Sequence, residues 1–396
     1  MHQSHYLYNP YRSVCGFSSS KMISQEDIGG LLNKYNLKDI TVGALGSHSA
    51  LDICRGAKEH GFRNIVVCQK GREKTYERYY KSGDGLGVVD ETIILEKFAN
   101  VTDNKILTEL QKRNTIFLPH RSFEVYVGFD KIENEFLLPL FGSRAMLRAE
   151  ERDAPRNQYY LMEKAGIPFP RVYKKPDDID RLVLVKVSEA HRTYERAFFF
   201  ASSPEEYQNK SDELLAAGTI TEDALKKAVV EEFVVGAQVN FNYFYSPLDD
   251  RLELLGTDTR RQTNLDGILR LPAKQQLEVM KYIDMKTVES GHIACTVKES
   301  LLEQIFELGE KFVKVSKKEY APGIIGPFAL QATFTPGPPK EIAVVFDISL
   351  RVQGSPGTKF TPYSEYLHGR GISVGERIAM ELKKAVDEER VQEIVT

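Results

Sequence analysis

The chain has 396 residues, of which 42% are hydrophobic and 28% charged, and its formal net charge is −3. Its length predicts about two or three domains of a soluble globular protein, and the near-neutral charge argues against bulk nucleic-acid binding. No apolar run is long enough for a membrane span, and the four scattered cysteines without a C-x-x-C spacing indicate neither a zinc site nor a disulfide framework, which fits the cytoplasm.

The N-terminal residues 1–21 contain tyrosines and a serine run but lack the apolar core of a signal peptide, so we expect a disordered tail. Ser24 and Asp27 then form a capping-box pattern that predicts the start of a first helix. The apolar residues at helical spacing after it are Ile28, Leu31, Leu32 and Tyr35.

Residues 22–145 are predicted to form an open α/β domain. A buried strand, a sharp loop, a helix and a second strand follow one another within about 30 residues, which is the pattern of a βαβ unit. A third short strand ends in another polar loop. The expected strands are 40–45, 64–68 and 115–118, and the loops are 46–49 (GSHS) and 119–122 (PHRS).

Both loops are expected at the carboxyl ends of parallel strands, where ligands of such sheets bind. His48 lies at a helix N-terminus, where backbone N–H groups and the helix dipole favour an anion such as a phosphate monoester. The alternative is that the serines of this loop only cap the helix. Ser122, with His120 and Arg121, offers similar donors, or belongs to an ordinary polar loop.

Residues 146–396 are predicted to form an α+β domain of antiparallel strands and packing helices. One strand alternates strictly, with Val239, Phe241, Tyr243 and Tyr245 on one face and Asn240 and Asn242 on the other. The expected helices are 157–165, 222–229, 299–315 and 374–395, and the expected strands are 181–187, 230–235, 239–245, 251–255, 329–335 and 341–347.

Several residues of this domain have the chemistry of nucleotide binding. Lys186 ends an apolar strand and can reach phosphates as a point charge, or it is a solvated strand residue. The run Glu231, Glu232, Phe233 and Val234 offers a carboxylate and backbone groups for a nucleoside, or is a charged strand start. Arg260 next to Arg261 suits a phosphate clamp, or a surface salt-bridge cluster.

The last two predicted strands form a hairpin around residues 336–340 (PGPPK). If the hairpin is symmetric about Pro339, Gln331 and Asp347 face each other, with Cβ atoms about 4.5–5.5 Å apart. Two facing oxygen ligands suit Mg²⁺ against nucleotide phosphates, and Arg351 is then available for a phosphate. The alternative is that one side chain faces solvent and the other pairs with a lysine.

Longer stretches of the chain resemble a known family, the archaeal formate-dependent 5-formaminoimidazole-4-carboxamide ribonucleotide synthetases of purine biosynthesis. The resemblance covers nearly all of residues 22–396. It implies an ATP-grasp fold over 146–396, in two subdomains, after a Rossmann-like pre-ATP-grasp domain. The stretches that carry it are LGSHSALDICRGAK (45–58), VCQKGRE (67–73), FGSRAMLR (141–148), VNFNYFYSPLDDRLELLGTDTRR (239–261), NLDGILRLPAKQQLE (264–278), IIGPFALQ (324–331) and DISLR (347–351).

The resemblance also implies a reaction and a division of the site. ATP would phosphorylate formate, and the 5-amino group of an aminoimidazole carboxamide ribonucleotide would attack the formyl phosphate. Mg²⁺, or Mn²⁺ in its place, would assist, and a homo-oligomer, a trimer or a hexamer, is expected. The implied roles are substrate binding by His48, Ser122, Asn264 and His292, ATP binding by Lys186 and Glu231 to Val234, metal binding by Gln331 and Asp347, and catalysis by Arg351 and Arg260.

The chain departs from the family pattern around the nucleotides. Residues 188–200 (SEAHRTYERAFFF) contain no glycine where the family has a glycine-rich loop over the phosphates. His292 stands in place of an asparagine, Asp347 in place of a glutamate, and Gln262 and Thr263 where a glutamate precedes NLDG. Two alternatives therefore accompany the formylating ligase: an ATP-grasp ligase for another acid or amine, and a weakly active, nucleotide-binding paralogous subunit.

Overall fold

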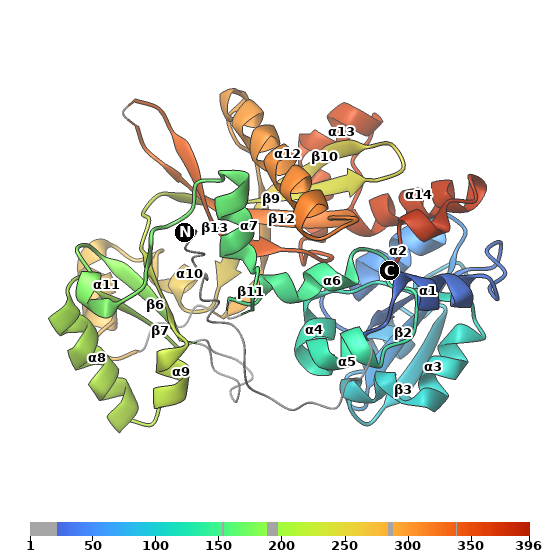
Figure 1. The fold of residues 1–396 in the computed structure, drawn as a ribbon, viewed down its shortest axis with the longest axis horizontal. Helices are drawn as coiled ribbons and strands as arrows, with labels where there is room; N and C mark the ends of the chain where they lie inside the picture. The colour runs from blue at the N-terminus through green and yellow to red at the C-terminus, as the bar shows by residue number, and fades with distance from the viewer. Residues whose placement is uncertain (1–21, 153, 188–196, 284–287, 338) are drawn as a thin grey trace, which may run out of the picture.

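The computed structural model describes residues 22–396 except 153, 188–196, 284–287 and 338, so the predicted tail over 1–21 lies outside the described residues. Three sheets organise the chain (Figure 1). The first has the order β3-β2-β1-β4, the second β11-β10-β9-β12-β13, and the third β5-β8-β6-β7. The first is parallel and the other two are antiparallel, which confirms the predicted combination of α/β and α+β parts.

The parallel sheet is built as the sequence predicts. Ser24 caps α1 through a capping box with Asp27, and β1 pairs with both β2 and β4, so the loops that follow β1 and β4 are neighbours. The strands are β1 (Thr41–Leu45), β2 (Arg63–Gln69), β3 (Glu91–Leu95) and β4 (Thr115–Phe117). The helices are α1 (Gln25–Leu32), α2 (Ala50–Glu59), α3 (Asn104–Gln111), α4 (Arg121–Val127), α5 (Phe129–Asn134) and α6 (Arg144–Leu147), with short turns η1 (Thr75–Tyr79), η2 (Phe98–Thr102) and η3 (Arg148–Glu150).

The small antiparallel sheet forms a separate lobe, at the left of Figure 1. The predicted helix 222–229 ends earlier, and the strand after it is shorter than the predicted 230–235. The strands are β5 (Val172–Tyr173), β6 (Val183–Val187), β7 (Ala197–Ala201) and β8 (Val229–Glu232). The remaining elements of this lobe are η4 (Pro176–Asp178), α8 (Pro204–Ala216) and α9 (Glu222–Lys226), whereas α7 (Gln158–Ala165) packs with α12 in the core of the central sheet.

The central sheet has one apolar and one polar face, as the alternation in β9 predicts. Val239, Phe241 and Tyr243 pack in an apolar core with α12, whereas Asn240 and Asn242 point to the other face. The strands are β9 (Ala237–Ser246), β10 (Arg251–Gln262), β11 (Glu289–Cys295), β12 (Gly326–Thr335) and β13 (Ile342–Ser349). The accompanying helices are α10 (Leu265–Ile268), α11 (Ala273–Val279), η5 (Glu299–Leu301), α12 (Leu302–Glu319), η6 (Pro356–Phe360) and α13 (Pro362–His368).

The hairpin β12–β13 has the predicted facing pair, Gln331 opposite Asp347, but it also has a bulge. The register shifts after this pair, because Ala332 pairs with Val345 and leaves Phe346 as the extra residue. Val345 and Ile348 both lie in the apolar core although they are three positions apart, whereas core residues of a regular strand are two positions apart. The bulge therefore places Asp347 on the polar face. A regular alternation starting from Val345 would have placed Asp347 on the apolar face.

The end of the chain differs from the predicted helix 374–395. Helix α14 (Val374–Asp387) stops earlier, a turn η7 (Val391–Glu393) follows, and Thr396 exchanges backbone hydrogen bonds of 3.0 and 2.9 Å with Leu140. Helix α14 lies against α2 so closely that a Cβ on Gly56 would come within 2.2 Å of the carbonyl oxygen of Gly375. The C-terminal segment thus completes the core beside the parallel sheet.

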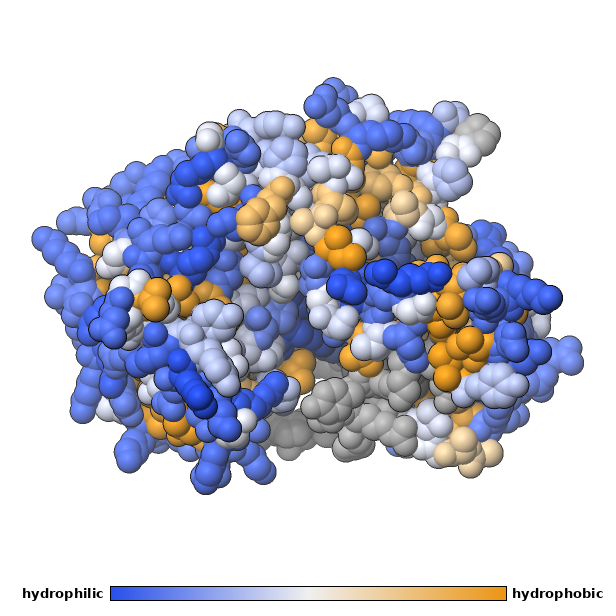
Figure 2. Space-filling model, turned by 180° about the vertical axis from the view of Figure 1, so that it is seen from behind, coloured by the Kyte–Doolittle hydropathy of each residue, from blue (hydrophilic) through white to orange (hydrophobic). Residues whose placement is uncertain are grey.

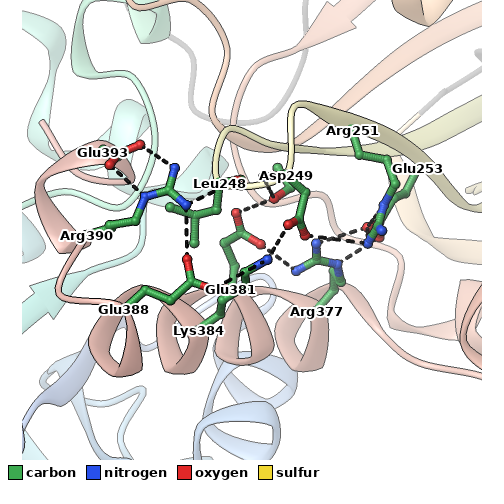
Figure 3. A network of polar contacts seen from close by, with 11 residues as sticks. Leu248, Asp249, Arg251, Glu253, Arg377, Glu381, Lys384, Glu388, Arg390 and Glu393 are labelled. Carbon is green, nitrogen blue, oxygen red and sulfur yellow. Dashed lines mark hydrogen bonds and ion pairs between the residues drawn. The ribbon is translucent and has the colours of Figure 1, made fainter.

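A buried ion-pair network joins α14 to the central sheet (Figure 3). The Arg377 guanidinium donates to both oxygens of Glu253, at 2.7 and 3.0 Å, and to Glu381 at 2.9 Å. It also lies 4.1 Å above the ring centre of Phe244. Burial by itself raises the pKa of Glu253, but the hydrogen bonds and charge of Arg377 outweigh it and lower the pKa to about 2.

The outer surface is largely polar. Seen from behind, hydrophilic residues dominate and hydrophobic ones form separate patches (Figure 2). Among the described residues, none of the helices combines the length and the apolarity needed to cross a lipid bilayer.

Arg377→Ala is expected to lower the free energy of unfolding by about 3–5 kcal/mol, because it leaves Glu253 and Glu381 buried without their cation. Urea denaturation measures the change. Lys383→Ala is the control, since Lys383 pairs with Asp387 on the exposed side of the same helix and should change stability by less than about 1 kcal/mol. Equal effects of the two substitutions would contradict the importance of the buried network.

Candidate active site

A row of polar side chains crosses the central sheet on its polar face. Asp258 of β10 pairs with Asn240 of β9, Asn240 pairs with Gln331 of β12, and Gln331 pairs with Asp347 of β13. Directly paired residues of neighbouring strands lie on one face of a sheet. The amides of Asn240 and Asn242 donate to the two oxygens of Asp258, at 2.8 and 2.6 Å. Four strands therefore bring ligand-type oxygens and amides into one line.

One end of this polar row is extended by His292 of β11. Its Nδ1 contacts Asp258 at 2.5 Å and its Nε2 contacts Glu289 at 2.8 Å. Burial by itself lowers the pKa of His292, but the hydrogen bonds to the two carboxylates outweigh it and raise the pKa to about 9. At neutral pH the ring is therefore an imidazolium that donates from both nitrogens.

Arg260 connects His292 to the predicted metal ligands. Its Nε lies 3.2 Å from Glu289, and its Nη2 donates to Oε1 of Gln331 at 2.6 Å. Asp347, at the far end of the polar row, accepts from Nη2 of Arg152 at 3.1 Å. Each of the two predicted metal ligands thus has one oxygen in contact with an arginine, so the protein already presents both side chains to a cation.

Lys186 and Glu231 form a buried pair beside Asp347. They are 5% and 3% exposed, the Lys186 ammonium contacts the Glu231 carboxylate, and Tyr159 donates to the other oxygen of Glu231 at 2.7 Å. Burial lowers the pKa of Lys186 against the opposing effect of Glu231, and the charges of Arg152 and Asp347 also act on it. The strand lysine is therefore not a solvated residue but part of the same charge cluster as Asp347.

The rest of the run after Glu231 points elsewhere. Glu232 lies on the opposite side of β8 and accepts from Arg181 at 3.1 Å near the surface. The N–H of Phe233 donates to the carbonyl oxygen of Leu182 at 3.0 Å, and Val234 lies beyond the end of β8. Of the two carboxylates in the predicted ATP-binding run, only Glu231 faces the polar cluster, and ATP contact by the other three stays a prediction.

The two loops of the parallel sheet meet as predicted. His48 stacks on His120 with ring centres 5.4 Å apart, and the Ser122 hydroxyl donates to that of Ser47 at 2.9 Å. The backbone of Gly354, just after β13, passes beside them, because a Cβ there would lie 2.9 Å from Nε2 of His48 and 3.6 Å from Nε2 of His292. The structure thus brings the predicted substrate residues His48, Ser122 and His292 to one place.

The hydrogen bonds of His48 fix its tautomer. Ser49 donates its hydroxyl proton to the carbonyl oxygen of Gln353 at 2.6 Å, so its Oγ accepts from Nδ1 of His48 at 2.7 Å. Burial, assisted by the charge of Arg351, holds the pKa of His48 well below its usual value. The ring is neutral and its Nε2 is a hydrogen-bond acceptor, which suits an N–H or O–H donor better than the phosphate expected from sequence.

The remaining predicted positions are Arg351, Asn264 and the loop without glycine. Arg351 follows β13, and its Nε lies 3.6 Å from both Glu124 and Glu150. Asn264 lies beyond β10 at the N-terminus of α10, with left-handed backbone (φ 38°). Residues 188–196, the loop without glycine, lie outside the described residues.

The sequence reasoning did not assign roles to Arg152, Tyr159, Asp258, Glu289, Glu124 or Glu150.

The oxygens of Gln331 and Asp347 fit a hard divalent cation in chemistry, since an amide and a carboxylate oxygen are typical ligands of Mg²⁺. Within the described part of the chain, no three His, Cys, Asp or Glu side chains gather as a metal-binding group. A cation at this pair would therefore need ligands from a substrate, as is usual for Mg²⁺ bound with nucleotide phosphates.

The fold is that of ATP-grasp enzymes. Similar solved structures include the Staphylococcus aureus N5-carboxyaminoimidazole synthetase, with 12% identity and a TM-score of 0.56 over 87% of this chain and 77% of that one. A second is the IMP biosynthesis protein PurP of Thermococcus kodakaraensis, with 29% identity and a TM-score of 0.66 over 90% of this chain and 100% of that one. The predicted ATP-grasp fold with a preceding parallel-sheet part is confirmed.

The sequence comparisons identify the family. Residues 42–173 match a family model described as "Protein of unknown function (DUF1246)" and residues 206–396 match "Domain of unknown function (DUF1297)". A curated protein of Methanopyrus kandleri is 42% identical over 95% of this chain and 100% of its own length, and one of Methanocaldococcus jannaschii is 39% identical over the same shares. Both are named 5-formaminoimidazole-4-carboxamide-1-(β)-D-ribofuranosyl 5′-monophosphate synthetase, and the chain belongs to this family.

The imidazolium of His292 predicts a pH dependence of stability. Its folded-state pKa of about 9 exceeds the usual 6.5 or so of an unfolded histidine. Its contribution is therefore complete below about pH 6.5 and is lost as the pH rises through about 9. The free energy of unfolding of the wild type minus that of His292→Asn should therefore fall by on the order of 3 kcal/mol as the pH rises over this range.

Denaturation curves at several pH values measure this difference. Ile293→Ala on the same strand is the control, because it removes no titrating group and its stability should change with pH in parallel with the wild type. A constant difference between wild type and His292→Asn from pH 6 to pH 10 would contradict the charged state of His292.

Proposed function

We propose that the protein is an ATP- and formate-dependent ligase that formylates the 5-amino group of 5-aminoimidazole-4-carboxamide ribonucleotide in IMP biosynthesis. The observation that carries the proposal is the match over 95% of the chain to synthetases named for the formamido product. The polar row and the Lys186–Glu231 pair support it, because they supply the charges that ATP chemistry needs. We also expect a cytoplasmic homo-oligomer, a trimer or a hexamer, that binds neither nucleic acid nor membrane.

The reaction follows from the weakness of formate as an electrophile. A formate oxygen attacks the γ-phosphorus of ATP, ADP leaves, and formyl phosphate forms. The 5-amino nitrogen then attacks the formyl carbon, phosphate leaves with the bonding electrons, and the nitrogen loses a proton to give the formamide. Phosphoryl transfer of this kind requires in-line positioning and neutralisation of charge, and the second step requires an acceptor for the amine proton.

The charged residues of the polar face are assigned to the phosphoryl half of the reaction. Lys186 would contact ATP phosphates, with Glu231 and the residues Glu232, Phe233 and Val234 on the nucleoside side. Gln331 and Asp347 would hold Mg²⁺, or Mn²⁺, which when bound neutralises phosphate oxygens. Arg351 and Arg260 would stabilise the charge that develops on the transferred group. Arg152 and Arg260, which now contact these two ligands, would release them to the metal.

The histidine side is assigned to the aminoimidazole nucleotide. His48, Ser122, Asn264 and His292 would bind it. The acceptor Nε2 of His48 is suited to an amine hydrogen, so this ring is our choice for holding the attacking amine. His292 supports a second candidate function, a ligase for another amine or acid. Both of its ring nitrogens already contact carboxylates, so neither is available for the substrate contact that the family's asparagine would make at this position.

The proposed activity is tested by incubating the purified protein with ATP, Mg²⁺, formate and the aminoimidazole ribonucleotide. ADP and the formamido nucleotide should appear in equal amounts. The controls omit formate or replace it with acetate, which separates the proposed acid from another one. If ADP release is no greater with formate than without it, formate is not the substrate.

Asp347→Ala is expected to lower kcat by at least about 100-fold, because it removes one of the two facing side chains, Gln331 and Asp347, that would hold the cation at the transferred phosphate. The melting temperature should fall by a few degrees at most, because Asp347 is partly exposed and loses one ion pair, with Arg152, so lost folding does not explain the lost activity. Asp387→Ala, which removes an exposed carboxylate from α14, is the matched control and should retain full activity. Undiminished turnover by Asp347→Ala would refute the metal assignment.

A further inference from the structure

Four charged residues around Arg351 have no role in the reaction as assigned so far. They are the buried Glu124 of α4 and Glu150 of η3, and the partly exposed Arg121 and Glu151. The side chains of Glu124 and Glu150 are 0% and 6% exposed, and each comes within 3.6 Å of Nε of Arg351. Two elements, α4 and η3, thus converge on the guanidinium of a residue about 200 positions further along the chain.

Glu150 also fixes the backbone from which Arg351 projects. Its Oε1 accepts the N–H of Leu350, and Gln158, whose side chain donates to the Glu150 carbonyl at 2.9 Å, accepts the N–H of Ile348 at 3.0 Å. On the other side of Arg351, the N–H of Val352 donates to the carbonyl oxygen of Pro119 at 3.1 Å. The edge of β13 is therefore held on both sides of Arg351, in the way that exposed strand edges are usually covered.

Arg121 makes the two buried carboxylates compatible. Its Nη1 lies 3.2 Å from Glu124, 3.7 Å from Glu150 and 3.3 Å from Glu151. Burial, followed by the charge of Glu150, raises the pKa of Glu124 to about 8 despite the two arginines. Two guanidinium groups thus face the two buried carboxyl groups Glu124 and Glu150, and the raised pKa keeps Glu124 largely protonated at neutral pH, so the buried charges are compensated.

We propose that Glu124 and Glu150 are positioning residues that hold the Arg351 guanidinium at its Nε and thereby orient its outer edge toward the transferred phosphoryl group. The two carboxylates come within 3.6 Å of Nε, the guanidinium nitrogen nearest the chain, as electrostatic contacts without a hydrogen bond, while Nη1 donates to the carbonyl oxygen of Val352 at 3.4 Å. The inference rests on the proposed function, because it assumes that Arg351 acts on the phosphoryl group. Neither carboxylate needs to touch a substrate.

Glu124→Ala should lower kcat by about 100-fold, since misplacement of a catalytic group by about 1 Å costs that much, while KM for ATP and for the nucleotide changes by less than about threefold. Glu124→Gln keeps the shape and the neutral state and should restore kcat to within about threefold of the wild type. Glu133→Ala is the matched control, because Glu133 forms a two-point contact with Arg148, two residues before Glu150, and it should leave kcat unchanged.

A double-mutant cycle separates positioning from general stabilisation. If Glu124 acts through Arg351, Glu124→Ala should not slow an enzyme that already carries Arg351→Ala. The same loss in both backgrounds would overturn the proposal. If Glu124→Ala does not fold, the cycle is made with Glu150→Gln, whose amide oxygen can still accept the Leu350 N–H and whose expected loss in kcat is about tenfold.

Crystal structures of the wild type and of Glu124→Ala keep this test separate from that of the proposed function. The guanidinium of Arg351 should move or lose order in the variant, whether or not the wild type proves to release ADP with formate. A guanidinium that keeps its place without Glu124 would overturn the positioning role, whereas a wild type without formate-dependent turnover would overturn the proposed function alone.

Discussion

The docking of α14 onto the central sheet is the interaction on which the site depends. The buried Arg377 binds Glu253 of β10 and Glu381 of its own helix, while the opposite side of α14 lies against α2. Helix α2 begins just after His48, and β10 carries Asp258 and Arg260. This helix therefore helps to set the position of the parallel sheet, with its histidine loop, relative to the sheet that carries the charged residues. The contacts of Ser49 with Gln353 and of Pro119 with Val352 add to it.

The charges on the polar face of the central sheet, some buried and some partly exposed, are paired with one another. Each charged side chain of the polar row and its neighbours has a partner of opposite charge or a hydrogen-bond donor: Asp258 has two amides and an imidazolium, Glu289 has His292 and Arg260, and Asp347 has Arg152. Removing a partner of the buried Asp258 would leave its charge uncompensated, which is costly, whereas solvent screens part of the same cost at Glu289 and Arg260, whose side chains are 38% and 37% exposed. The residues of the face are thus interdependent, and a ligand must exchange existing pairs for new ones.

Local patterns predicted the alternation in β9 and the capping box at Ser24, because neighbouring residues determine both. The facing pair was found, but the assumed symmetry about Pro339 is wrong beside the turn, where Thr335 pairs with Ile342. Only the bulge at Phe346 brings Asp347 opposite Gln331, and the sequence pattern did not predict that bulge. The early end of α14 was not predicted, because its apolar periodicity continues past the point where Glu389 adopts a left-handed backbone (φ 58°). The apolar residues after this turn instead fill the core beside the parallel sheet.

Some of the missed site residues have partners that are far away in the chain. Arg152 and Asp347 are 195 positions apart, and Glu150 and Leu350 are 200 apart. No spacing rule relates them, since only the packing of the two parts brings them together. Glu231 and Glu232 show the converse limit: the run of carboxylates was found, but the choice of the inward one depends on the register of β8 with β6.

The bulge in β13 has a consequence for how the family's sequences are compared. On the turn side of the bulge Ala332 pairs with Val345, and the next pair in a regular ladder would have joined Gln331 to Phe346. A strand one residue shorter, without the bulge, would therefore present the same carboxylate to the same glutamine. A one-residue gap at this point in an alignment of relatives is a neutral difference in length and not a sign that the cation ligand has been lost.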